Sequence, residues 1–167
     1  MRSYIFFSTI YSMSQEILDK YNKMQEELSL PHLHELKSKF KIDIQEDEKM
    51  FDHIRNELSE RLFMFNDSII EPVIGGMESF SCIFEQNMVS EAERKELFEL
   101  YKKIQMLKWE NNMLMISPDD KKTAAWIKKT WDIWNNEIQE KLMNFSEKMS
   151  IGWGSLKFKE KRSAYLG

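Results

Sequence analysis

The chain has 167 residues, enough to bury the core of one domain, and its 42% hydrophobic and 31% charged residues exclude wholesale disorder. Its formal net charge is −4 and its sequence pI is near 5.5, unlike the strongly basic profile of a dedicated nucleic-acid binder. A single cysteine, Cys82, excludes an internal disulfide and favours a reducing, cytoplasmic setting.

Residues 1–12 are predicted to be an N-terminal extension of the folded domain. The apolar run at 4–7 is too short to span a bilayer, and nearby serines interrupt it. It also lacks the long apolar region and the small-residue cleavage site of a signal peptide. We therefore expect a soluble protein with no membrane insertion.

Three long segments repeat apolar residues at steps of three and four, which places each set on one side of an α-helix. Such helices bury their apolar sides against one another, with the seam spacing of coiled coils. The stripes are Phe51, Ile54, Leu58, Leu62, Phe65 and Ile69; Leu97, Leu100, Ile104, Leu107 and Leu114; and Ile127, Trp131, Trp134, Ile138, Leu142, Phe145 and Met149. The sequence predicts an all-α antiparallel bundle of four to five helices.

Capping patterns divide the chain into these helices. A Ser or Asp precedes a Gln, Glu or Asp by three residues at Ser12, Asp43, Ser90 and Ser117. Helices are therefore predicted near 13–28, 31–41, 44–87, 91–115 and 118–150, with Pro118 at a first helical position. They form one predicted domain over 13–151. A basic C-terminal tail, 152–167, follows and contains Gly152 and Gly154 near its start.

The predicted helix over 44–87 contains a helix-breaking sequence. Pro72, Gly75 and Gly76 each disfavour a helix interior. The apolar phase nevertheless continues across them, which favours one long helix kinked near Pro72–Gly76 over a hairpin reversal. Asp67, Ser68 and Glu71 lie beside this kink, so they are the candidates if the chain is an enzyme or a small-ligand binder.

Asn111 interrupts the apolar stripe of the predicted 91–115 helix. It takes the inward position between Leu107 and Leu114. A buried Asn at a seam costs stability but fixes the register of coiled coils. The alternative is that the stripe drifts and that Asn111 faces water beside Asn112.

No catalytic or metal-binding motif is present in the sequence. The three histidines, His32, His34 and His53, do not form the spacings of zinc or di-iron sites. Cys82 has no basic neighbour in sequence that would activate its thiol. The sequence also lacks the phosphate-binding glycine motifs and the serine nucleophile elbow. We expect no enzyme activity, no cofactor and no metal.

The C-terminal third is basic whereas the rest of the chain is acidic. This asymmetry indicates either an anionic partner or packing of the last helix against acidic neighbours. Basic groups beside aromatic ones suit phosphate neutralisation and base stacking. The candidate partner-binding residues are Lys121, Lys122, Lys128, Lys129, Trp153, Lys157, Phe158, Lys159, Lys161 and Arg162.

The large apolar residues exceed what a small bundle needs, with 12 Met, 11 Phe and 5 Trp. A second copy or a partner helix could cover them. The sequence therefore favours a non-enzymatic protein-interaction or scaffold module that self-associates or binds a protein partner. A nucleic-acid-associated protein using the basic region 121–162 is possible but not favoured, and an enzyme or ligand binder at the kink is the remaining alternative.

Overall fold

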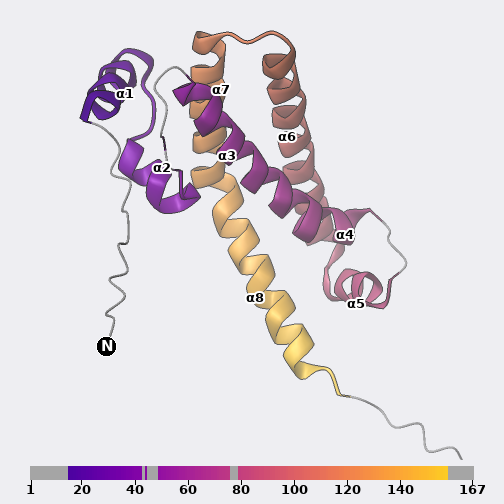
Figure 1. Ribbon diagram of the computed structural model, residues 1–167. Helices are drawn as coiled ribbons and strands as arrows, with labels where there is room; N and C mark the ends of the chain where they lie inside the picture. The colour runs from indigo at the N-terminus through magenta and orange to yellow at the C-terminus, as the bar shows by residue number, and fades with distance from the viewer. Residues whose placement is uncertain (1–14, 43, 45–48, 76–78, 158–167) are drawn as a thin grey trace, which may run out of the picture. The chain divides into compact units, whose positions relative to one another are not determined.

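The computed structural model describes residues 15–42, 44, 49–75 and 79–157, and every regular element in these ranges is helical (Figure 1). The prediction of an all-α fold with kinked long helices packed against one another is confirmed. The chain divides into two compact units, here called unit 1 and unit 2. Unit 1 combines Met1–Phe63 with Met106–Asp132, and unit 2 combines Met64–Gln105 with Ile133–Gly167. The single domain predicted for 13–151 stays a prediction, and residues 1–12 lie outside the described ranges.

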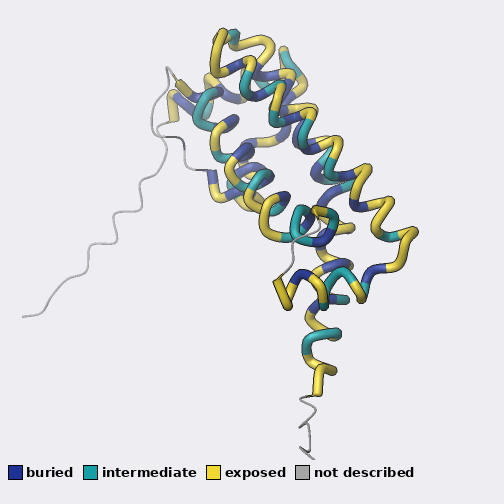
Figure 2. The backbone as a smooth tube through the Cα atoms, turned by 90° about the vertical axis from the view of Figure 1, so that its right-hand side faces the viewer, coloured by how far each residue is buried: buried dark blue, intermediate teal, exposed yellow. Residues whose placement is uncertain are grey.

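Unit 1 is built from five helical segments. They are α1 (Gln15–Leu28), α2 (Leu33–Phe40), most of α3 (Met50–Phe65), the end of α6 (Glu91–Ile116) and α7 (Asp120–Ile133). Buried and exposed residues alternate along the helices, as the predicted stripes require (Figure 2). All five segments contribute buried side chains to this unit, among them Tyr21, Leu36, Phe40, Ile54, Leu58, Leu62, Leu107, Trp126 and Ile127.

Two buried hydrogen bonds join elements of unit 1. The Trp126 indole Nε1 of α7 donates to the Leu107 carbonyl oxygen of α6 over 3.0 Å. The Tyr21 hydroxyl of α1 donates to the Pro31 carbonyl oxygen over 2.7 Å, next to the start of α2. Burial raises the pKa of the Tyr21 phenol, so the group stays a neutral donor. Each bond satisfies a polar atom that folding removes from water.

Unit 2 contains the remaining elements. They are η1 (Asn66–Ile70), α4 (Glu71–Ile74), α5 (Phe80–Met88), the first part of α6, η2 (Trp134–Ile138) and α8 (Gln139–Ser155). Its buried apolar residues are Ile70, Val73, Cys82, Val89, Leu97, Leu100, Ile104, Trp134, Ile138, Leu142, Phe145 and Met149. Trp153 of α8 packs on Phe84 of α5 with ring centroids 4.6 Å apart, and its Nε1 donates to Glu85 Oε1 over 3.0 Å.

Both long helices of this region contain a π-helical turn, η1 and η2. The residues that open them stack, since the Phe65 and Trp134 rings lie 5.6 Å apart and 29° from parallel. The η1 turn directly precedes Pro72, which lacks a backbone donor. Within it, the Ser68 hydroxyl donates to the Met64 carbonyl oxygen over 2.6 Å, a bond that bends helices. The irregularity begins at Asn66, six residues ahead of Pro72, and contains this hydrogen bond.

The helix predicted over 44–87 is shorter in the structure than the continuous apolar pattern indicated. It begins at Met50, and α4 ends at Ile74. Gly75 closes it by donating to the Glu71 carbonyl oxygen over 2.7 Å. A fresh cap then starts α5, because the Ser79 hydroxyl accepts from the Cys82 backbone N–H. Gly76 and the rest of 76–78 lie outside the described residues.

One predicted helix start is confirmed and another is wrong. Ser90 and Glu93 form the predicted capping box, with each side chain accepting from the other's backbone N–H at 2.8 and 3.3 Å. At the next helix the cap is Asp119, whose Oδ1 accepts from the Lys122 N–H over 2.9 Å. Pro118 therefore precedes α7. The starts predicted at Ser12 and Asp43 lie outside the described residues.

The C-terminus of α1 provides a test of this local geometry. Ser29 adopts a left-handed conformation with φ 53°, and Leu30 N–H donates back to the Gln25 carbonyl oxygen over 3.1 Å. Because glycine adopts this conformation without a Cβ penalty, Ser29→Gly should raise the free energy of unfolding by roughly 0.5–1 kcal/mol. Chemical denaturation measures it. The control Ser38→Gly, inside α2, should lower that free energy, and a loss of stability in Ser29→Gly would contradict the assignment.

Candidate functional site

The most exposed apolar surface of unit 1 lies on the outward face of α6. Met106, Trp109, Met113 and Ile116, here called the outer stripe, follow one another at steps of three, four and three residues. Their exposed fractions run from 60 to 85%. The opposite face of the same helix is buried through Leu107 and Leu114. The end of α6 is therefore apolar on two faces, and the described residues cover only one of them.

A groove between α6 and α7 borders the outer stripe; we call it the α6–α7 groove. Its volume is about 460 Å³, and its walls are mostly apolar. The lining residues are Glu110, Met113, Leu114, Ser117, Lys122, Ala125, Trp126 and Lys129. Met113 belongs to both features, so the stripe and the groove form one continuous surface. Concave apolar surface of this size is typical of binding sites.

The charged residues at the rim of the α6–α7 groove are paired within unit 1. Lys129 Nζ lies 2.6 Å from Glu110 Oε1, and Lys122 Nζ lies 3.9 Å from Asp119 Oδ2. On the other side of the stripe, the Lys108 ammonium lies 5.7 Å from the centre of the Phe63 ring. The surface therefore presents apolar side chains in the middle, ion-paired residues along the groove and the charged Lys108 on the other side.

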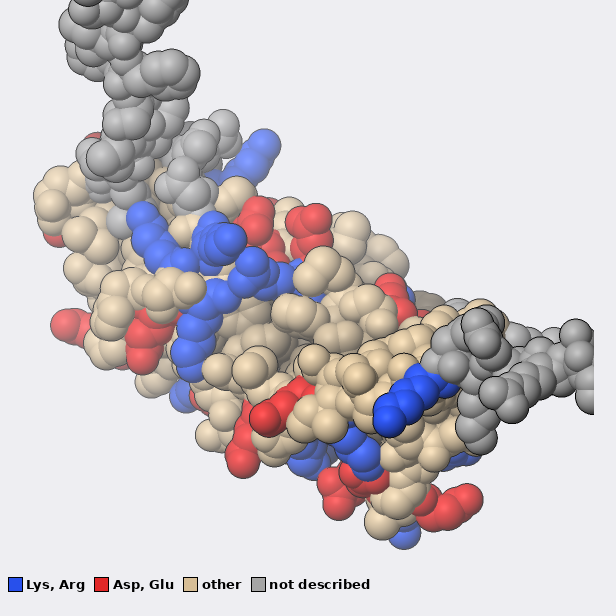
Figure 3. All heavy atoms as spheres, turned by 90° about the horizontal axis from the view of Figure 1, so that it is seen from below, with Lys and Arg blue, Asp and Glu red and all other residues tan. Residues whose placement is uncertain are grey.

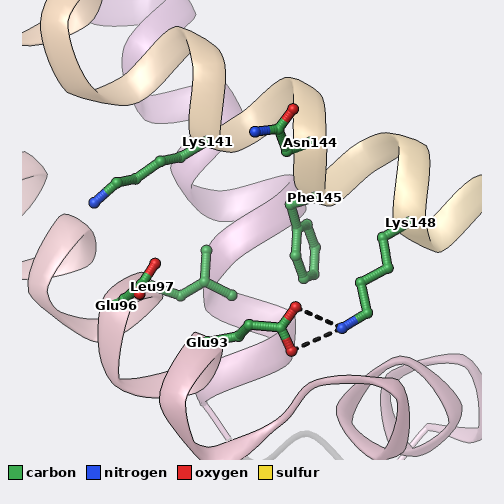
Figure 4. Close-up of a pocket in the computed structure, with 7 residues that line it drawn as sticks. All are labelled: Glu93, Glu96, Leu97, Lys141, Asn144, Phe145 and Lys148. Atoms are coloured by element: carbon green, nitrogen blue, oxygen red, sulfur yellow. Dashed lines mark hydrogen bonds and ion pairs between the residues drawn. The ribbon is translucent and has the colours of Figure 1, made fainter.

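A second, smaller groove of about 160 Å³ lies between α6 and α8 in unit 2 (Figure 4). At one end, Lys148 Nζ donates to both Glu93 carboxylate oxygens at 2.6 and 2.7 Å. The Lys148 bond, and then the Ser90 bonds of the capping box, lower the Glu93 pKa from its ordinary 4.5 to about 2. A carboxylate held ionised in this way caps α6 and ties it to α8, so it is a structural anion and a poor general acid.

The predicted basic residues of α7 are at the surface, as a solvated helix face requires. Lys121, Lys122, Lys128 and Lys129 are all exposed. Lys122 and Lys129 face acidic residues of their own unit, as described above. In unit 2, Lys103 and Glu137 form another such ion pair. Figure 3 shows this mixing of signs, with Lys and Arg side chains beside Asp and Glu side chains.

The aromatic residues expected near these lysines are engaged in packing. Trp131 and Trp134 are buried. Trp153 is half-buried against Phe84, and Lys157 is exposed. The remaining predicted residues of the tail, Phe158, Lys159, Lys161 and Arg162, lie outside the described ranges. No described aromatic side chain of α7 is thus left open for stacking against a base.

The polar residues at the predicted kink line neither of the two grooves. Asp67 and Ser68 are exposed, while Pro72 and Glu71 are half-buried. Asn66 is the buried polar residue of η1, and its amide nitrogen donates to Asp67 Oδ1 over 2.9 Å. The grooves described above are lined by residues of α6, α7 and α8.

The potential metal ligands of the described residues are dispersed. No group of three or more His, Cys, Asp or Glu side chains in these ranges could hold a metal ion. Cys82 is a buried free thiol. In the same ranges, the helices are too short or too polar to cross a membrane. Comparison of the chain with protein-family models, curated proteins and solved structures finds no match.

Asn111 faces inward, as its place in the stripe predicts. It is 5% exposed, and its Nδ2 donates to the Met115 sulfur over 3.8 Å. Its buried Oδ1 accepts no hydrogen bond from the described residues. A register function for Asn111 stays a prediction, because register is a property of helix pairing that substitution must test.

The sequence analysis singled out lysines and the kink and missed the outer stripe. The signal was present, since the four residues have helical spacing. The spacing was not distinctive, because the buried residues on the opposite face of α6 follow the same helical spacing. Only packing decides which of the two faces is covered.

Asn111→Leu should raise the free energy of unfolding by about 1–2 kcal/mol, because it removes a buried acceptor without a partner. Urea denaturation measures the change. Asn112→Leu is the matched control, since the neighbouring Asn112 is half-buried, and its effect should be smaller. Destabilisation by Asn111→Leu would show that its amide makes a necessary contact.

The Glu93 ion pair predicts a pH-dependent stability. The folded pKa lies below the ordinary value, so the carboxylate contributes stability above pH 4.5 that is lost as pH falls toward about 2. Because the pair is partly exposed, its contribution is at most about 1 kcal/mol. The free energies of unfolding of wild type and Glu93→Gln should differ most above pH 4.5, and the difference should shrink as the pH falls toward 2.

The control for this experiment is Glu96→Gln, an exposed residue on the same turn of α6. The free energy of unfolding of Glu96→Gln should stay within about 0.5 kcal/mol of the wild-type value at every pH. A Glu93→Gln profile that runs parallel to wild type across the acid range would refute the ion-pair assignment.

Proposed function

We propose that the chain is a non-enzymatic helical protein-interaction module of the cytoplasm, which binds a protein through the outer stripe of α6. One observation carries the proposal: four large apolar side chains at helical spacing are 60 to 85% exposed. Scattered exposed apolar residues are ordinary, but a contiguous row of them is typical of interaction surfaces.

The surroundings of the outer stripe support this function. Two of its members, Met106 and Met113, are flexible and polarizable, which suits a surface that must adapt to a partner. Trp109 is a residue type enriched among the anchors of protein interfaces. The adjoining α6–α7 groove offers a depression for a partner's side chain. The surface thus combines an anchor, adaptable contacts and a concavity.

Binding fits the grooves better than catalysis does. The walls of the α6–α7 groove are mostly apolar, and its Glu110 and Lys129 neutralise each other. In the α6–α8 groove, Glu93 is bound by Lys148. A catalytic group needs a reacting atom within reach and a pKa near the working pH. The reducing setting favoured by the single Cys82 remains part of the proposal.

The nucleic-acid alternative has less support from the arrangement of the basic region. Phosphate binding needs lysines whose charges are available, and Lys122 and Lys129 already face carboxylates. Base stacking needs exposed aromatic faces, and Trp131 and Trp134 are buried. The protein-interaction function is therefore preferred.

Affinity capture from the native cell tests the proposal with a matched pair of variants. Trp109→Glu places a charge in the outer stripe, whereas Met143→Glu places one on α8, where Met143 is 66% exposed. We expect a protein that is retained by wild type and Met143→Glu and reduced at least tenfold by Trp109→Glu. Equal retention by all three would remove the outer stripe as the binding surface.

A further inference from the structure

We infer that the outer stripe of α6 is covered by the outer stripe of a second copy of this chain. The inference rests on the proposed function, because it names the partner of the same surface. It would make the chain a homodimer in which the two α6 helices pack against each other about a two-fold axis. Such an interface uses one surface patch twice, so it requires a patch that is complementary to itself.

The spacing of the stripe meets this requirement. Met106, Trp109, Met113 and Ile116 alternate at steps of three and four, the repeat that lets two helices interlock their side chains along a seam. All four are uncharged, so a two-fold pairing opposes no like charges within the stripe. The methionines can adapt to the bulk of Trp109 from the facing helix.

The charges around the stripe favour an apolar partner over an acidic or basic one. Glu110 is paired with Lys129 at 2.6 Å, and Lys108 lies over the Phe63 ring. A charged partner is selected by complementary charges at the rim of a surface. Here Glu110 and Lys129 compensate each other within unit 1, and Lys108 is the one of these three residues whose charge has no carboxylate partner among the described residues. The surface therefore matches an equally apolar, uncharged helix face, and the chain itself presents one.

The exposed area sets the expected strength of the dimer. If a large side chain presents on the order of 200 Å², the stripe offers roughly 500 Å² per copy. Two copies would bury about 1,000 Å², which is the lower limit for a specific interface. The dimer is therefore expected to be reversible, with a dissociation constant in the micromolar range.

Sedimentation velocity over about a hundredfold range of protein concentration tests the inference. Wild type should change from a 20.1 kDa monomer to a species of twice that mass as concentration rises. Trp109→Glu and Met113→Glu should each raise the dissociation constant at least tenfold. Met143→Glu is the matched control for Met113→Glu, since the two methionines are 66 and 62% exposed, and it should dimerise like wild type.

Circular dichroism of each variant distinguishes a loss of dimerisation from a loss of folded structure. All three substitutions replace exposed side chains, so helical content should match wild type. If one stripe variant unfolds, the other still decides the question.

Two results would overturn the inference. One is a wild-type protein that stays monomeric across the whole range. The other is a dimer that persists in both stripe variants. If the protein is monomeric and Trp109→Glu still abolishes capture of a different protein, the proposed function stands and only the second copy is excluded. If the stripe variants alter neither dimerisation nor capture, both proposals fail.

Discussion

The structure depends on α6, a helix that is apolar on two faces and that the other described helices cover on one of them. Its inner face supplies Leu97, Leu100 and Ile104 to unit 2, and Leu107 and Leu114 to unit 1. Burying this seam stabilises both units, since apolar burial is the main favourable term in folding. The same helix then exposes its outer stripe. Folding therefore uses the inner face of α6, and the exposed outer face is the one that we propose for binding.

Polar interactions hold α6 with the inner face turned inward. In unit 1, the Trp126 indole donates to the Leu107 carbonyl oxygen, and Glu110 pairs with Lys129. In unit 2, Glu93 caps α6 and binds Lys148 of α8. These contacts contribute modest free energy individually. They accompany the apolar packing of the inner face and leave the outer stripe exposed.

Sequence patterns predicted those features that depend on nearby residues. Most positions of the buried stripes and the Ser90–Glu93 capping box follow from helical spacing and cap chemistry alone, although Phe65 and Ile69 are only half-buried. Burial of Asn111 decides between two orientations that the spacing left open. Other features depend on a competition that the pattern cannot decide. Asp119 displaces Ser117 as a cap, and Gly75 ends a helix through which the apolar phase continues. The pairing of Lys129 with Glu110 joins residues 19 positions apart, and such tertiary pairs have no local signature.

We infer that the outer stripe is the self-association surface of the chain and that other exposed apolar residues are not. Methyl NMR of the methionines tests it directly, because exposed methionines occur both on the stripe and elsewhere, at Met64 and Met143. As protein concentration rises, the Met106 and Met113 methyl resonances should shift or broaden while those of Met64 and Met143 stay constant. Changes confined to Met64 or Met143, or uniform across all four, would contradict the account.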